Sequence, residues 1–304
     1  MAVTVQPAVR QSEPSSYRTP EVPVSVRRSR MADGHSGLHP FSPFVIVWRY
    51  RELIWQMTKR EVIGRYRGSI LGVLWSFLTP LCMLAIYSFV FGFVMHVRWR
   101  AESPSQIESS LILFAGLVVY GLFAECVTRA PGLIVSNTNY VKKVIFPLEI
   151  LPWVIIGAAL FHALMSLIVL FIFTIGVYGT LPWTVVTLPV IVLPFVLLTV
   201  GLCWFLASLG VFLRDINQTV GLFTTALLFL SPVLYPSSSV PASIHLLLLV
   251  NPLTFVVEQV RDALLWGHVP HWSGLGCYFI GSVVIAWFGL WWFQKTRRGF
   301  ADVL

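Results

Sequence analysis

Few residues of this 304-residue chain have the types and spacing needed for acid–base or metal chemistry. His162 stands alone in a long apolar stretch, where a hydrogen-bonded packing histidine is the first interpretation and a proton relay the second. Glu125 is followed four residues later by Arg129, so the two share one helical face; we expect an ion pair first and a functional carboxylate second. Because no Ser/His/Asp arrangement, histidine pair or metal-binding cluster is visible, we predict no catalytic residue and no metal site.

The sequence also contains no Gly-x-x-x-x-Gly-Lys-Ser/Thr motif, so the chain cannot hold nucleotide phosphates by that device. Its cysteines lie in apolar stretches without metal-ligand spacing and are expected to be small packing residues rather than disulfides: Cys82, Cys126, Cys203 and Cys277. Proton-coupled transporters usually place acidic residues near the membrane midplane, and no such acid is convincing here. Any energy source is therefore expected to lie outside this chain, which needs no cofactor of its own.

The elements that must position these residues are membrane helices. The chain is 57% hydrophobic and 11% charged, whereas soluble domains are roughly 25% charged. A helix needs about 20 apolar residues to cross a bilayer. Six stretches approach or exceed that length and predict an all-α, six-span integral membrane protein: 69–95, 111–129, 151–177, 185–212, 217–235 and 274–293.

The net charge of +8 is best explained by membrane topology rather than by nucleic-acid binding. Lysine and arginine are concentrated in cytoplasmic loops of membrane proteins. Between the predicted spans, one side holds only Arg98, Arg100 and Arg261. The other side, which we assign to the cytoplasm together with both termini, carries Arg49, Arg51, Lys59, Arg60, Arg65, Arg67, Arg129, Lys142, Lys143, Arg214, Lys295, Arg297 and Arg298.

Two segments precede the six-span domain at 69–304. Residues 1–40 have no apolar core and predict a disordered cytoplasmic extension. Residues 41–68 begin with Ser42-Pro43, a favourable helix start. Apolar residues then recur at helical spacing, which predicts an amphipathic helix on the membrane surface: Tyr50, Leu53, Ile54 and Met57.

Residues 236–272 do not fit a seventh span. Asn251-Pro252 interrupts their short apolar runs, and Glu258, Arg261 and Asp262 would be costly facing lipid. A further span would also place the basic C-terminus outside. We therefore expect short re-entrant or interfacial helices on the outer side, with the three charged residues satisfying one another or water.

Five motifs occur in a fixed order along these elements: Arg65-Tyr66-Arg67-Gly68-Ser69-Ile70-Leu71-Gly72, Tyr140-Val141-Lys142-Lys143 with Phe146-Pro147-Leu148-Glu149, Phe212-Leu213-Arg214-Asp215-Ile216, Ser231-Pro232-Val233-Leu234-Tyr235, and Asn251-Pro252-Leu253. Over about residues 44–304 the chain thereby resembles the membrane subunits of type-two ABC exporters. It is most similar to the branch that exports O-antigen, capsule and teichoic-acid polymers.

The resemblance implies a homodimer in the bacterial cytoplasmic (inner) membrane, working with two nucleotide-binding subunits that carry ATP and magnesium. It implies that this permease moves a lipid-linked glycan. It places the ATPase contacts on the surface helix and on the loop between the second and third spans. The implied coupling residues are Arg60, Arg65, Tyr140, Lys142, Lys143, Glu149, Arg214 and Asp215, and the implied outer gate contains Asn251, Glu258, Arg261 and Asp262.

In such exporters the first and fifth spans line the path at the dimer interface. Aromatic rings there can pack on the C–H faces of sugars, although lipid-facing aromatics are the ordinary alternative. The candidate path residues are Trp75, Tyr87, Phe91, Phe223, Phe229 and Tyr235.

Two other functions are compatible with parts of this pattern. A small-molecule or drug exporter could use the same scaffold, because a fold does not determine its substrate. A membrane enzyme acting on lipid-linked sugars would need a catalytic cluster that the sequence does not offer.

Overall fold

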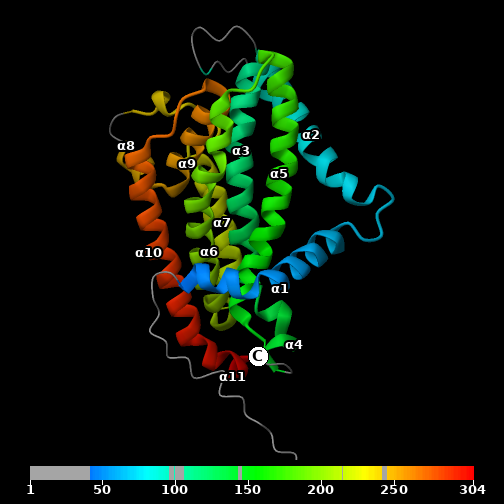
Figure 1. Ribbon diagram of the computed structural model, residues 1–304, viewed down its shortest axis with the longest axis vertical. Helices are drawn as coiled ribbons and strands as arrows, with labels where there is room; N and C mark the ends of the chain where they lie inside the picture. The colour runs from blue at the N-terminus through cyan, green and yellow to red at the C-terminus, as the bar shows by residue number, and fades with distance from the viewer. Residues whose placement is uncertain (1–41, 96–98, 100–105, 143–145, 214, 242–244) are drawn as a thin grey trace, which may run out of the picture. The chain divides into compact units, whose positions relative to one another are not determined.

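The computed structural model describes residues 42–95, 99, 106–142, 146–213, 215–241 and 245–304, and every regular element among them is a helix (Figure 1). The predicted extension at 1–40 and the first residue of the predicted surface helix lie outside the described residues. The α-helices are α1 (Ser42–Arg65), α2 (Trp75–Tyr87), α3 (Gln106–Arg129), α4 (Thr138–Lys142), α5 (Leu151–Tyr178), α6 (Leu188–Phe212), α7 (Ile216–Leu230), α8 (His245–Val250), α9 (Pro252–Arg261), α10 (Trp272–Thr296) and α11 (Phe300–Val303).

Five helical segments in the described part of the chain are long and apolar enough to cross a membrane: Gly72–Val94, Ile107–Arg129, Leu148–Tyr178, Trp183–Phe212 and Trp272–Gly299. They coincide with five of the six predicted stretches. In the first, α2 continues into the wider helical turns of η2 (Ser88–Val94).

The sixth predicted stretch, 217–235, contains the shorter apolar helix α7 of 15 residues. Fifteen residues rise only about 22 Å, less than the ~30 Å hydrocarbon core. The helix ends because Ser231 adopts extended backbone, as is common for a residue before proline, here Pro232. A six-span topology therefore stays a prediction.

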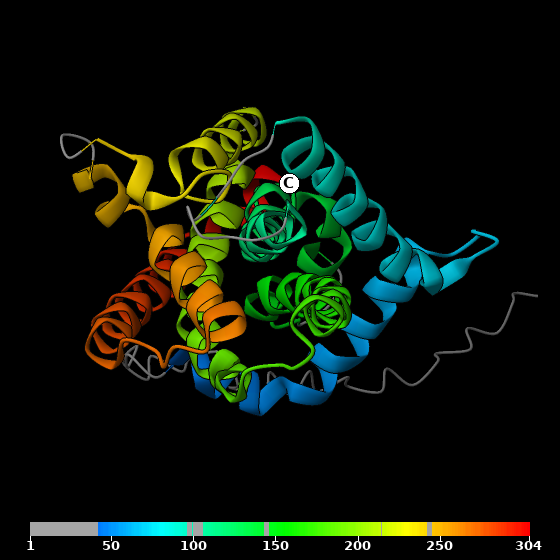
Figure 2. The same cartoon turned by 90° about the horizontal axis from the view of Figure 1, so that it is seen from above.

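The long helices pack through glycine. A Cβ atom on Gly201 of α6 would lie 2.7 Å from the backbone of Ala286 on α10, and one on Gly289 would collide with the backbone of Gly201. Small residues allow such close backbone approach, which supplies dispersion contacts where lipid removes any hydrophobic advantage. Figure 2 looks along α3 and α5, both of which pack against α6.

Helix α1 runs across the long helices rather than along them and is kinked at Tyr50 (Figures 1 and 2). It packs against α5, α10 and the short turn η4 (Leu148–Ile150). Thr58 contacts α5 where Gly157 has no side chain. The predicted apolar face is half-buried on the bundle side, with Met57 touching the core. The opposite face carries Trp48 and Trp55, which are 75% and 70% exposed. The placement of α1 on the membrane surface stays a prediction.

The segment expected to contain outer re-entrant helices forms α8, α9 and the short helical turn η8 (Asp262–Trp266). Helix α9 packs on α3 and α6, in the half of the bundle away from α1 (Figure 1). Its re-entrant placement in a membrane stays a prediction. The C-terminal α11 contacts α4 and α6 at the opposite end.

Candidate functional site: a polar cluster joining α1, α3 and α5

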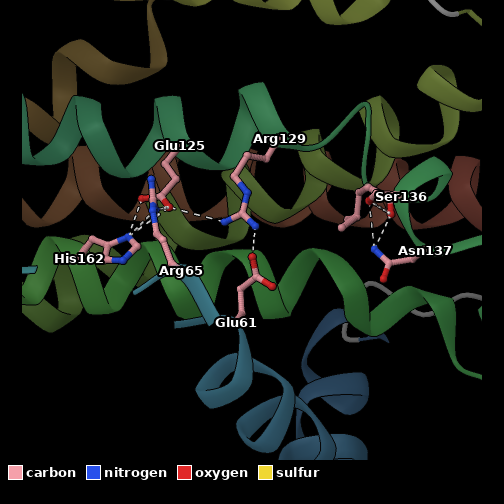
Figure 3. Close-up of polar contacts among 8 residues, drawn as sticks. Glu61, Arg65, Glu125, Arg129, Ser136, Asn137 and His162 are labelled. Atoms are coloured by element: carbon pink, nitrogen blue, oxygen red, sulfur yellow. Dashed lines mark hydrogen bonds and ion pairs between the residues drawn. The ribbon is translucent and has the colours of Figure 1, made fainter. Parts of the chain in front are cut away.

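Glu125 is the centre of a charged cluster at the end of α3 (Figure 3). Its Oε1 lies 2.5 Å from Arg65 Nη1 on α1, and its Oε2 lies 2.9 Å from His162 Nδ1 on α5. The expected pair with Arg129 is confirmed, with 3.6 Å between Nη1 and Oε1. Arg129 also pairs with Glu61 on α1. Three helices distant in sequence therefore share one network of ion pairs and hydrogen bonds.

Helical spacing positions these side chains. Glu61 and Arg65 are four residues apart on α1, as Glu125 and Arg129 are on α3, so each helix presents one acid and one base on the same face. The acid of each helix meets a base of the other. The side chains of Glu125 and His162 are only 16% and 18% exposed, whereas that of Arg65 is 53% exposed. Glu125 is thus the inner acceptor, and an unpaired carboxylate there would be costly.

His162 has the hydrogen-bonded environment that the sequence suggested, but its partner is a carboxylate on another helix. Its Nε2 is buried and has no hydrogen-bond partner among the described residues. The ring meets Tyr66 edge-on, with 6.1 Å between centroids. Burial raises the pKa of the Tyr66 hydroxyl, while the charge of Arg65 opposes that rise. Tyr66 therefore remains a neutral ring at physiological pH.

The loop after α3 is tied to α1 by a second set of contacts. Arg60 of α1 donates to the hydroxyl of Tyr140 at 3.2 Å, and the Tyr140 ring stacks on Phe146 with 4.5 Å between centroids. Ser136 and Asn137 cap the turn before α4 by donating to the carbonyl of Leu133 (Figure 3).

The same loop is anchored to the C-terminal end of α10. Arg297 Nη1 lies 3.0 Å from Glu149 Oε2, and its Nη2 donates to the carbonyl of Phe146 at 3.0 Å. Trp204 of α6 donates its indole N–H to the Glu149 carbonyl at 2.9 Å. Movement of this loop would therefore act on α1, α6 and α10 together.

The remaining candidate coupling residues fall at the end of α4 and just before α7. Helix α4 ends at Lys142, whose side chain is outside the described residues, as are Lys143 and Arg214 entirely. Asp215 is exposed and precedes α7, and its carbonyl oxygen accepts the backbone N–H of Gln218 at 3.1 Å.

Arg261, a candidate outer-gate residue, is buried and donates to three carbonyl oxygens instead of facing a carboxylate. The acceptors are Ile112 at 2.9 Å, Pro232 at 2.5 Å and Val233 at 2.8 Å. Its guanidinium also lies 4.4 Å from the ring centroid of Trp99. The bonds to Pro232 and Val233 satisfy carbonyls left free where α7 ends, and the bond to Ile112 ties that turn to α3.

Burial lowers the pKa of Arg261 to about 9, and the charge of Glu258 opposes that fall, so the guanidinium is charged at neutral pH. Asn251 binds the same turn through Ser231 Oγ at 2.8 Å and caps α9 by accepting the N–H of Leu253 at 3.0 Å. Asp262 lies 3.3 Å from His268 Nδ1. The four candidate gate residues are thus grouped on α9 and its ends, with two of them holding the turn after α7.

The candidate path residues flank α3 on two sides rather than lining one pocket. Helices α2 and α7 both pack on α3 (Figure 2). Tyr120 of α3 donates its hydroxyl to the Thr224 carbonyl of α7 at 3.0 Å. Large exposed rings occur on both α2 and α7. Trp75, Phe223 and Phe229 are 43%, 58% and 62% exposed, and Tyr87, Phe91 and Tyr235 are half-buried.

Comparison with known proteins gives consistent matches over this fold. The model of the ABC-2 type transporter family matches residues 52–265. The chain is 29% identical to the O-antigen export system permease protein RfbA of Klebsiella pneumoniae over 83% of this chain and 95% of that protein. It is 30% identical to the RfbA protein of Myxococcus xanthus over 84% and 96%. It is 25% identical to the polysialic acid transport protein KpsM of Escherichia coli over 76% and 88%.

Proposed function

The chain belongs to the ABC-2 type transporter family, and from this premise we propose that it is the permease subunit of an ATP-driven polysaccharide exporter. Its cargo would be a lipid-linked polymer of the O-antigen, capsule or teichoic-acid type. The observation that carries the proposal is the similarity over most of the chain to permeases that export O-antigen and polysialic acid. The all-helical fold with several membrane-spanning helices agrees with this role.

The proposed polymer path follows the exposed aromatic faces of α2 and α7. A second copy of the chain would cover these faces, so that Trp75, Phe223 and Phe229 line the space between two protomers. Aromatic rings pack on the apolar faces of sugars and leave the hydroxyl groups hydrated, which allows a polymer to slide. Support comes from the exposure of these rings on both sides of α3.

The proposed energy source is a separate nucleotide-binding subunit, in two copies, that binds ATP and magnesium. It would push on α1 and on the loop containing Tyr140 and Glu149. The Arg60–Tyr140 bond and the Glu125 cluster then give its motion a continuous set of contacts into α3 and α5. Lys142, Lys143, Arg214 and Asp215 would contact the same subunit.

The proposed location is the bacterial cytoplasmic membrane, with six spans and both termini in the cytoplasm. The basic residues of α1 and of the α10 C-terminus would then share the cytoplasmic side. Helices α8 and α9 would form the outer gate, in which Arg261 and Asn251 hold the turn after α7.

Depletion of the protein in its native cell tests this function. Lipid-linked glycan inside the cell and polymer at the cell surface would be measured, with re-expression of the wild-type chain as the control. We expect finished lipid-linked polymer to accumulate inside while surface polymer disappears. Unchanged surface polymer without internal accumulation, in a strain lacking any second such permease, would refute the proposal and favour a small-molecule exporter.

A further inference from the structure

A basic pocket lies where the end of α1 meets the end of α3. Its volume is about 760 Å³, and it is lined by Arg60, Glu61, Gly64, Arg65, Arg67 and Arg129. Four of these six lining residues are arginines. No apolar side chain is among them, which distinguishes the pocket from a site for a hydrophobic ligand.

The charged partners around this pocket neutralise only part of its positive charge. Arg65 pairs with Glu125, and Arg129 pairs with both Glu125 and Glu61. Arg60 donates to a neutral group, the hydroxyl of Tyr140. Arg67 is exposed, and its guanidinium has no hydrogen bond or ion pair with another described residue. Four guanidinium groups therefore face two carboxylates, and Arg60 and Arg67 carry the uncompensated charge.

The position of the pocket along the chain places it at a boundary of the membrane-spanning segments. Arg67 lies just before the first candidate span, which begins at Gly72, and Arg129 is the last residue of the second, Ile107–Arg129. Gly68 follows Arg67 with a positive φ of 88° and turns the chain toward that span. Phosphate groups of lipids lie at the edge of the hydrocarbon core, where arginine side chains bind them.

We propose that this pocket binds a phosphate or diphosphate ester, and that the ester is the headgroup of the lipid that carries the glycan. Identification of the lipid rests on the proposed function, whereas the anion site rests on the pocket alone. Arg60 and Arg67 donate to the phosphate oxygens as planar, paired donors. The Glu61 and Glu125 pairs hold Arg65 and Arg129 in place, so the pocket is shaped before the anion arrives.

The test uses the full-length chain in phosphatidylcholine nanodiscs and two probes, farnesyl diphosphate and inorganic diphosphate, with affinity measured by titration calorimetry. Arg67→Gln and Arg60→Gln remove one donor each. Arg49→Gln is the matched control, because Arg49 is on the same helix but lines a different pocket. We expect about a tenfold weaker affinity for farnesyl diphosphate in each pocket variant and an unchanged affinity in Arg49→Gln. Arg67→Lys should restore part of the loss because it keeps the charge.

Each other result overturns a defined part of the proposal. Equal losses in Arg67→Gln and Arg49→Gln would mean general attraction to basic surface and would refute the site. Binding of inorganic diphosphate without competition by farnesyl diphosphate would refute the lipid as its source. Unchanged diphosphate binding in Arg60→Gln and Arg67→Gln, combined with lost association of the ATPase subunit in the same variants, would identify the pocket as a protein contact. If the probe binds as expected but depletion leaves surface polymer unchanged, the site stands and the exporter function fails.

Discussion

Replacing Glu125 by glutamine is expected to loosen α1 from the long helices. The side chain is 16% exposed, and its carboxylate oxygens lie 2.5 Å from Arg65 Nη1, 2.9 Å from His162 Nδ1 and 3.6 Å from Arg129 Nη1. Charged hydrogen bonds contribute roughly 1.5–3 kcal/mol each. Arg65 is 53% exposed, so water screens its share to below about 1 kcal/mol. Because glutamine keeps the size and one acceptor, we expect a net loss of about 2 kcal/mol.

That loss has two measurable consequences in the purified full-length protein. The melting temperature should fall by about 3 °C. Amide hydrogen exchange in the second half of α1, after the kink at Tyr50, should accelerate by about 30-fold, since ~1.4 kcal/mol corresponds to a factor of ten.

The matched control is Glu61→Gln. Glu61 also pairs with an arginine of α3, but the two side chains are 41% and 36% exposed, so the expected loss is only about 0.5 kcal/mol. A double-mutant cycle of Arg65→Gln with Glu125→Gln should give a coupling energy below about 1 kcal/mol. If Glu125→Gln leaves both the melting temperature and the exchange of α1 at wild-type values, Glu125 does not hold α1 in place and the reasoning is wrong.

Three further predictions concern other contacts. Gly289→Ala should lower the melting temperature by about 3 °C, corresponding to about 2 kcal/mol, because the new Cβ would collide with α6. Gly281→Ala, whose Cβ meets no atom within 4 Å, should leave the melting temperature unchanged. Similar melting temperatures for the two variants would contradict the close packing. Arg261→Lys should lower the free energy of unfolding by about 3 kcal/mol and reduce the yield of folded protein in detergent, because one ammonium group cannot satisfy three separate carbonyls. A wild-type yield would show that these carbonyls need no guanidinium. Tyr140→Phe should change the free energy of unfolding by less than about 1 kcal/mol. It should nevertheless reduce transport-coupled ATP hydrolysis by the partner subunit, because it removes the hydroxyl that accepts the hydrogen bond of Arg60. Unaltered hydrolysis would show that this bond takes no part in coupling.

Much of the fold could be predicted because the relevant signals are local. The ends of α3, α5, α6 and α10 agree with the predicted stretches to within a few residues, since hydropathy is a property of adjacent residues. Helix α7 proved shorter than predicted because its apolar stretch continues past Ser231-Pro232, where the helix ends. Hydropathy cannot detect an end that backbone geometry imposes.

The candidate site was predictable only where its partners share a helix. The Glu125–Arg129 pair follows from a four-residue spacing, and it forms. From the sequence, His162 was expected to be a hydrogen-bonded packing histidine, and Arg261 was expected to be satisfied by neighbouring acids or by water. In the structure His162 meets a carboxylate on α3, and Arg261 binds carbonyls on α3 and after α7. Pro232 was the sequence signal for the contact of Arg261 with the turn after α7, because a proline marks carbonyls that have no helical partner.

By itself, the sequence determined that this is a helical membrane protein, which segments are apolar enough to span, and which family motifs it carries. These properties depend on composition and on spacing within one helix. The tertiary structure alone decided that Arg65, Glu125 and His162 meet, that Arg60 contacts Tyr140, and that four arginines surround one pocket. Those partners come from different helices, so their meeting depends on how α1 crosses α3 and α5, and that crossing is set by packing at positions such as Gly157, where only a residue without a side chain lets α1 approach.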